Sequence, residues 1–337
     1  MKKKLISSIL ALGMVASLAA CGGGNTTASA APSAAPSEAP AASQNEKLVV
    51  GFAQIGQESG WRDAETSSIQ FYAGQNLDTI DLKFADAQQK QENQIKAIKS
   101  FIDMGVDVIG LAPVVETGWD AVFTEAKDAG IPVVLLDRRA DVSEDLYSTF
   151  IGSDFIKEGQ DGADEMATLL GSKGKIVELE GTVGASAAND RKKGFDDQLA
   201  AKYPDIEILA SQTGDFTRAK GKEVMESYLK TYGSDIQGVF AHNDDMMLGA
   251  IEAIKEAGMK PGVDIKTVSC DGVKGIFEAM AAGEANVTVE CNPLLGPQFF
   301  ETCAQLKAGK DVEKWIKSDE SVYRADTAAT DLPNRLY

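Results

Sequence analysis

The chain has 337 residues, of which 44% are hydrophobic and 25% charged, and its formal net charge is −18 at pH 7. This length is enough for two domains. Such an acidic balance argues against nucleic acid as a partner, because phosphate binding needs clustered Lys and Arg, but it does not constrain a neutral ligand.

Residues 1–20 read as a secretory signal peptide. Three lysines at positions 2–4 precede an apolar run at 5–18, which is too short and too rich in small residues for a membrane span of roughly 20 apolar residues. The run ends in Leu18, Ala19, Ala20 and Cys21, which resembles a bacterial lipoprotein signal. We therefore expect Cys21 to become the lipidated first residue. An ordinary signal peptide with a chance cysteine is the alternative.

Residues 21–46 are predicted to form the lipidated cysteine and a disordered tether. After three glycines the segment alternates Ala, Ser and Pro, and it lacks the apolar residues needed to bury a core. A lipid and a tether together fit a domain that stays close to a membrane and moves freely.

The folded part, from about residue 47, alternates short apolar runs with helical patterns. Ile95, Ile98 and Ile102 repeat at helical spacing before Gly105, and similar patterns precede Gly130 and Gly258. The apolar runs show little alternation, which is typical of parallel strands covered on both faces. The pattern predicts α/β architecture with two doubly wound parallel sheets. The predicted strands are 47–54, 80–85, 106–112, 132–136, 175–179, 206–211, 238–241, 266–270 and 286–290.

Polar side chains follow five of these strands, at the edge where open α/β sheets bind ligands. Carboxylates and guanidinium groups make paired hydrogen bonds to adjacent hydroxyls, an amide donates and accepts, and an aromatic face covers the C–H surface of a sugar. The pattern therefore predicts a site for a small sugar. These residues are Trp61, Arg62, Asp137, Arg138, Arg191, Asn243 and Asp271, with Phe216 as a second aromatic wall.

Each of these residues also has a structural interpretation. Asp271 precedes a glycine in a common turn pair, Asp137 fits a cap or an ion pair with Arg138, Arg191 fits a surface pair and Trp61 fits the core. Their joint placement at strand ends favours a site more than any single residue does.

The sequence lacks the usual signs of catalysis. His242 has no serine or cysteine partner at a recognisable spacing and is expected to be structural or to support the site from behind. Asp244 and Asp245 fit the first turn of a helix. No phosphate-binding loop or dinucleotide fingerprint follows a strand, so no cofactor and no enzymatic activity are expected.

Three cysteines remain after Cys21, namely Cys270, Cys291 and Cys303. An odd number without a CxxC or Cys/His cluster predicts neither a disulfide framework nor a metal site. We expect buried thiols. One disulfide bridge, either Cys270–Cys291 or Cys291–Cys303, is the alternative.

Several longer segments resemble the ribose/galactose-type (type I) periplasmic binding proteins that serve ABC importers, and within them the galactofuranose-binding members. The resemblance runs from about residue 49 to 296. The segments that carry it are 58–62 (ESGWR), 87–97 (AQQKQENQIKA), 112–115 (APVV), 135–138 (LLDR), 180–186 (EGTVGAS), 190–195 (DRKKGF), 214–218 (GDFTR) and 241–245 (AHNDD).

The resemblance implies two lobes joined by a three-strand hinge, with the sugar in the cleft. The N-terminal lobe would comprise residues 47–151 plus 293–320, and the C-terminal lobe 152–291 plus 321–337, with crossings near 151–154, 291–293 and 321–323. Relatives vary near the second crossing, where Cys291 and Asn292 lie. The implied ligand-binding residues are Glu58, Ser59, Gly60, Trp61, Arg62, Asp137 and Arg138 in the first lobe and Arg191, Phe216, Asn243 and Asp271 in the second.

The expected protein is thus an extracytoplasmic monomer, lipid-anchored to the outer face of the cell membrane, whose partners are a monosaccharide and an ABC transporter permease. Galactofuranose is the expected sugar; ribose, galactopyranose or another pentose or hexose is the alternative, as is a sensory role. A transcription regulator of the same fold would need a helix-turn-helix at the start, where this chain has a signal and a tether. A secreted α/β enzyme is a further alternative, and incubating sugars with the protein without finding a product would argue against it.

Overall fold

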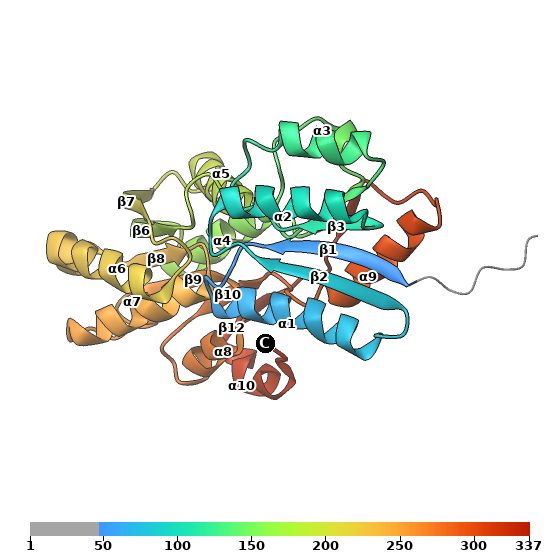
Figure 1. The fold of residues 1–337 in the computed structure, drawn as a ribbon. Coiled ribbons are helices and arrows are strands. Elements are labelled where there is room, and N and C mark those ends of the chain that lie inside the picture. The colour runs from blue at the N-terminus through green and yellow to red at the C-terminus, as the bar shows by residue number, and fades with distance from the viewer. Residues whose placement is uncertain (1–46) are drawn as a thin grey trace, which may run out of the picture. The chain divides into compact units, whose positions relative to one another are not determined.

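Two six-stranded sheets organise residues 47–337, which are the residues that the computed structural model describes (Figure 1). The predicted signal, Cys21 and the tether lie outside the described residues. Both sheets are parallel except where β12 pairs antiparallel with β10. The first sheet has the order β11-β5-β4-β3-β1-β2 and the second β12-β10-β9-β8-β6-β7, so that without their first strands the two sheets share one topology.

The strands of the first sheet are β1 (Leu48–Gln54), β2 (Ile80–Asp86), β3 (Val108–Leu111), β4 (Val133–Leu136), β5 (Thr149–Gly152) and β11 (Trp315–Lys317). Those of the second sheet are β6 (Gly174–Glu180), β7 (Ile206–Thr213), β8 (Gly238–Ala241), β9 (Lys266–Asp271), β10 (Val287–Glu290) and β12 (Val322–Arg324).

Helices cover both faces of each sheet, as the unbroken apolar runs predict. The helices of the first lobe are α1 (Gly60–Gln75), α2 (Gln91–Met104), α3 (Asp120–Asp128) and α9 (Gly296–Lys307). Those of the second lobe are α4 (Phe155–Leu170), α5 (Ser186–Lys202), α6 (Arg218–Tyr232), α7 (Asp244–Glu256), α8 (Lys274–Ala281) and α10 (Ala325–Asp331).

Each sheet has one apolar core on each of its faces. In the first lobe, Val50 and Phe52 pack with Phe299 of α9, while Ile109 packs on the opposite face with Phe101 of α2. Figure 1 shows α1 and α2 on opposite sides of β1 and β2. The second lobe repeats this arrangement, with α4 and α5 over one face and α6, α7 and α8 over the other. Burial on both faces explains why these strands lack polar alternation.

The chain passes between the two sheets three times: between β5 and α4, between β10 and α9, and between β11 and β12. Strands β5, β11 and β12 were not predicted as strands. β11 and β12 have three residues each, which is too short for a hydrophobic period to show. β5 is as long as the predicted β3, β4 and β8, but it contains only two apolar residues, Phe150 and Ile151. The segments expected to be hinge crossings near 151–154 and 321–323 therefore lie partly in β5 and β12.

Candidate functional site

A cavity of about 260 Å³ lies between the carboxyl ends of the two sheets. Both sheets present their topological switch point here, since β1 lies between β2 and β3 as β6 lies between β7 and β8. The lining residues are Glu58, Ser59, Trp61, Arg62, Asp137, Arg138, Ala187, Arg191, Phe216, Asn243, Asp271 and Cys291.

The first helical turn after β1 builds much of the first wall. Ser59 caps α1 by accepting a hydrogen bond from the backbone N–H of Arg62 (3.2 Å), which fixes where the helix begins. Trp61 and Arg62 thereby face the cavity. The buried Arg62 guanidinium then donates to Glu65 and Asp137 and reaches Glu58 at 3.3 Å.

The turn after β4 supplies the rest of the first wall. Asp137 adopts a left-handed backbone conformation (φ 62°), while its N–H donates to the carbonyl of Ile151 (2.9 Å). Arg138 donates to Glu58, and its guanidinium lies 5.1 Å from the ring centroid of Phe216 in the second lobe. The Nε–H of Arg138 has no hydrogen-bond partner among residues 47–337, although it is buried.

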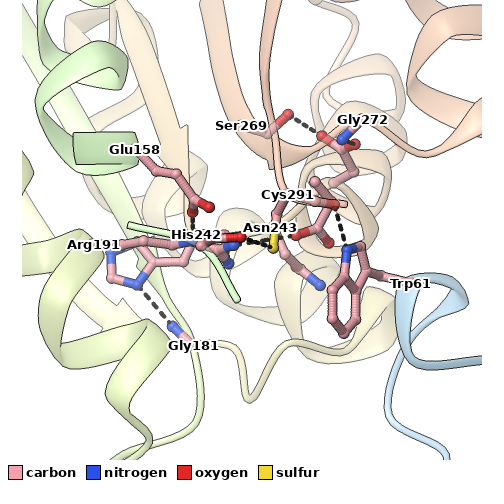
Figure 2. Close-up of polar contacts among 12 residues, drawn as sticks. Trp61, Glu158, Gly181, Arg191, His242, Asn243, Ser269, Gly272 and Cys291 are labelled. Carbon is pink, nitrogen blue, oxygen red and sulfur yellow. Dashed lines mark hydrogen bonds and ion pairs between the residues drawn. The ribbon is translucent and has the colours of Figure 1, made fainter. Parts of the chain in front are cut away.

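Arg191, in the second turn of α5, is the centre of the second wall. Its Nε donates to Glu158 Oε2 and its Nη1 to the carbonyl of His242, both at 2.6 Å, while Nη2 lies 3.4 Å from Asp271 Oδ1 (Figure 2). Figure 2 also shows Gly181 donating to His242 Nδ1 (3.2 Å). His242 is fully buried and supports Arg191 from behind rather than lining the cavity.

Asn243 and Asp271 lie at the ends of β8 and β9. Asn243 caps α7 through Oδ1 (2.9 Å from the N–H of Met246), and its Nδ2 donates to the carbonyl of Phe216 (3.0 Å). Its second amide hydrogen stays available for a ligand. Asp271 ends β9 with φ 119°, and 3% of the residue is exposed. Its carboxylate has one side-chain contact, the one with Arg191.

Burial and charge act in opposite directions on the buried arginines. Burial alone lowers the pKa of Arg62, but Glu65, Asp137 and Glu58 outweigh it, so the pKa stands well above its ordinary value. For Arg138 burial prevails and the pKa is lowered. Guanidinium groups stay charged in either case. The lining therefore places three arginines against Glu58, Asp137 and Asp271, a balance that suits a neutral, hydroxyl-rich ligand.

Asp271 is a carboxyl group whose charge the fold disfavours. Burial, with the nearby carboxylates of Asp244 and Glu158, raises its pKa well above the ordinary value, and Arg191 offsets this only in part. A hydrogen-bond donor from a ligand would stabilise this carboxylate.

Hydrogen bonds between the lobes surround the cavity. They run from Gly60 N to Asp245 Oδ2 (2.8 Å), from Trp61 Nε1 to the carbonyl of Cys291 (2.6 Å), from Arg139 N to Ser186 Oγ (2.8 Å) and from Glu116 N to the carbonyl of Gly184 (2.9 Å). The structure thus has the lobes closed over the site.

The structure brings together ten of the eleven residues predicted for the site. Gly60 is the exception, because its N–H points to Asp245 of the other lobe and it does not line the cavity. Ala187 and Cys291 line the cavity and were not predicted as site residues. Cys291 follows β10, so reading that strand end as well would have found it; nothing in the sequence singles out Ala187.

The buried thiols of Cys270, Cys291 and Cys303 are free in the described part of the chain, so the two bridges left open above are not formed. No helix among residues 47–337 is long and apolar enough to cross a membrane.

A family model described as a periplasmic binding protein domain matches residues 50–311, which is most of the chain. The chain belongs to the periplasmic binding proteins. This periplasmic binding protein is 52% identical to the galactofuranose-binding protein YtfQ of Escherichia coli K12 over 293 residues, which cover 86% of this chain and 91% of the relative.

Solved structures agree with this membership. A Mycobacterium smegmatis protein in complex with β-D-fucofuranose is 50% identical, with a TM-score of 0.82, and the match covers 85% of this chain and 94% of the other. The periplasmic binding protein of the arabinose ABC transporter from Shewanella sp. ANA-3, bound to α- and β-L-arabinofuranose, is 51% identical with a TM-score of 0.82, covering 86% and 95%. Like these relatives, the periplasmic binding protein described here is extracytoplasmic and is not an enzyme.

Proposed function

We propose that this protein captures a monosaccharide in its furanose form between the two lobes and delivers it to an ABC importer, with galactofuranose as the expected sugar. The observation that carries the proposal is the lining of the cavity. Three buried arginines alternate there with carboxylates, and the aromatic rings of Trp61 and Phe216 come from opposite lobes. Adjacent hydroxyls match such paired donors and acceptors.

Unfilled hydrogen-bonding capacity supports ligand roles for particular residues. The Nε–H of Arg138 has no hydrogen-bond partner within residues 47–337, since Asp137 Oδ2 lies 3.8 Å away, and a buried donor without a hydrogen bond costs free energy. Among the described residues, the carboxylate of Asp271 has a single side-chain hydrogen bond, the long one with Arg191. We assign hydroxyl binding to Asp137, Arg138, Arg191, Asn243 and Asp271, and ring stacking to Trp61.

The furanose ring form follows from the relatives. Proteins about 50% identical to this chain are described as galactofuranose-binding or are bound to fucofuranose or arabinofuranose. These sugars share a five-membered ring and differ in the substituent beyond it.

Calorimetry with galactose, arabinose and ribose tests the proposal, and carbon NMR of ¹³C-labelled bound galactose reports the ring form. We expect binding tighter than millimolar and furanose signals in the bound spectrum. Binding of none of these sugars contradicts sugar capture, and a bound pyranose contradicts the ring assignment. A bound sugar returned as a different compound would contradict a purely binding role.

Ligand capture would couple to closure of the lobes. We infer that residues 47–151 plus 293–320 and residues 152–291 plus 321–337 move as two rigid bodies, because the polar groups that bind the sugar are divided between them. A ligand that bridges both walls binds the closed form better and shifts the population toward it. The importer permease would then recognise the closed monomer.

Attachment to the membrane through Cys21 belongs to the same proposal. The support comes from the sequence, in which Leu18, Ala19 and Ala20 precede Cys21 and a low-complexity segment follows. Metabolic labelling with a radioactive fatty acid tests it: wild-type protein should take up label and Cys21→Ser should not. Label in both proteins, or in neither, would contradict lipidation at Cys21.

A further inference from the structure

A second polar cluster lies behind the ligand cavity, where the three chain crossings meet. Glu158 comes from the first turn of α4, after the first crossing; Cys291 directly follows β10; and Glu320 lies between β11 and β12. One donor atom from each of the three residues lies within 4.8 Å of the other two. These donors are far apart in the sequence, so only the hinge brings them together.

The carboxylate of Glu158 is incompletely satisfied. Its Oε2 accepts from Arg191 at 2.6 Å (Figure 2), whereas its Oε1 has no hydrogen-bond partner among residues 47–337. Only 3% of this side chain is exposed. A buried carboxylate oxygen without a partner is costly, so the site lacks a donor or a cation at this point.

The surroundings favour a cation. Glu158 and Glu320 also line a pocket on this side of the hinge, whose described lining includes six carboxylates and two lysines. Two of the carboxylates are paired with arginines outside this lining, Glu158 with Arg191 and Glu290 with Arg335, whereas Asp319 and Glu320 have no salt bridge among residues 47–337. Both lysines are already paired: Lys317 lies 2.7 Å from Asp154, and Lys157 contacts Asp161.

We propose that Glu158, Cys291 and Glu320 bind a divalent transition-metal ion of the Zn²⁺ class at the back of the hinge. The Ser153 hydroxyl, which donates to Glu320 and lies 3.3 Å from Cys291 Sγ, is placed to be a fourth ligand. One sulfur and two carboxylates suit Zn²⁺, whereas Ca²⁺ and Mg²⁺ prefer oxygen ligands alone. On binding, the Cys291 thiol releases its proton to solvent and coordinates as thiolate.

Glu158 would then link the ion to Arg191 through its two oxygens. Cys291 and Glu320 lie in two of the crossings, Ser153 lies in the third, and Glu158 follows it, so the ion would restrain all three segments of the hinge at once. Arg191 and Cys291 line the ligand cavity as well, so the ion and the ligand would share one wall. The two binding events would then be coupled reciprocally.

The test measures Zn²⁺ on the full-length protein without any sugar, which keeps it separate from the proposed function. Chelator-treated protein is dialysed against micromolar Zn²⁺, and bound metal is counted by mass spectrometry for wild type, Cys291→Ser, Glu320→Gln and Cys303→Ser. The last variant is a matched control, because Cys303 is an equally buried thiol outside the cluster. A parallel titration with Co²⁺ reports sulfur ligation through its charge-transfer absorption.

We expect wild type and Cys303→Ser to hold one more Zn²⁺ per chain than Cys291→Ser and Glu320→Gln, and Co²⁺ to show the sulfur band only in the first two. Equal metal in all four proteins would overturn the proposal, as would a preference for Ca²⁺ over Zn²⁺. If Cys291→Ser does not fold, Glu320→Gln decides alone, since that side chain lies at the edge of the cluster and is only partly buried.

Discussion

The two walls of the ligand cavity use the same residue types in different ways. In the first wall, the guanidinium of Arg62 contacts three carboxylates of its own lobe, those of Glu58, Glu65 and Asp137, and Glu58 also accepts from Arg138. Such a cross-linked network holds its geometry without a ligand.

The second wall is less constrained. Arg191 is held by Glu158 and by a backbone carbonyl, but within residues 47–337 the Asp271 carboxylate has just one side-chain hydrogen bond, a long one with Arg191. The comparison indicates that the half-site on the first lobe is preformed. In the half-site on the second lobe, the Asp271 carboxylate would receive its remaining hydrogen bonds from the ligand. The first wall should therefore contribute to stability and affinity together, and the second mainly to affinity.

The largest effect is expected for Arg62→Ala. The substitution leaves buried carboxylates without their counter-charge, which costs about 3 to 5 kcal/mol of unfolding free energy. Denaturation in urea measures this, and sugar affinity should fall as well. Lys99→Ala is the control, because it removes an ion pair with Glu125 that is about half exposed and should cost no more than about 1 kcal/mol. Equal losses in both variants would contradict a preformed first wall.

The support behind the second wall should respond to pH. Burial would raise the pKa of Glu178, but His242 at 3.0 Å and Lys192 at 2.6 Å outweigh it and lower the pKa to about 2. A lowered carboxyl pKa stabilises the fold above the ordinary value near 4.5, and this contribution is lost as pH falls toward 2.

Glu178→Gln should therefore cost about 3 kcal/mol of unfolding free energy at pH 7. The difference from wild type should shrink as pH falls below about 4.5, which denaturation curves at several pH values would show. If the difference in unfolding free energy between wild type and Glu178→Gln were constant with pH, the charge of the Glu178 carboxylate would contribute nothing to stability.

Asp271→Asn compared with Asp137→Asn separates the two walls with one chemical change. Both aspartates have positive φ, which asparagine tolerates. Replacing Asp271 should lower sugar affinity about 10- to 150-fold, the worth of a charged hydrogen bond. Stability should not fall, because burial raises the pKa of Asp271 and the fold disfavours its charge.

Asp137→Asn should lower both the sugar affinity and the free energy of unfolding, because it breaks the ion pair with Arg62. Calorimetry and urea denaturation of both variants provide the comparison. A larger loss of stability in Asp271→Asn than in Asp137→Asn would reverse the assignment of the walls.

The smallest effect is expected for Trp61→Phe. The variant keeps an aromatic face but loses the hydrogen bond from Nε1 to the carbonyl of Cys291 in the other lobe. Affinity should fall about 2- to 12-fold, corresponding to one neutral hydrogen bond. Trp61→Ala should lose considerably more affinity, because it also removes the aromatic surface on which the sugar stacks. Similar affinities of the two variants would argue against stacking on Trp61.

Much of the fold could be predicted because it depends on repeated local patterns. Nine strands and the helices between them show in apolar runs that the double coverage of each sheet requires. Strands β11 and β12 could not be predicted, because three residues carry no period. Strand β5 was missed because it contains only two apolar residues, Phe150 and Ile151. Their pairing is decided by where the chain crosses between the sheets.

The site was predictable to the extent that strand ends converge at one edge of a parallel sheet. That rule finds Asp137, Arg191 and Asp271 without knowledge of their contacts. It does not find Ala187, whose place in the lining depends on how deeply α5 packs. Gly60 was expected from the family resemblance instead, and the direction of its N–H depends on how the lobes close. Sequence patterns carry no information on either.

The packing of α5 depends on two glycines. A Cβ on Gly159 of α4 would lie 2.2 Å from the carbonyl oxygen of Arg191, and one on Gly194 of α5 would lie 2.1 Å from that of Ile156. The backbones of α4 and α5 are therefore in direct contact next to Arg191. The contact between the two main chains sets how far the Arg191 guanidinium extends into the cleft. A single methyl group at either glycine would therefore displace the arginine while leaving every ligand-contacting residue chemically unchanged, so redesign for a new sugar has to keep both glycines.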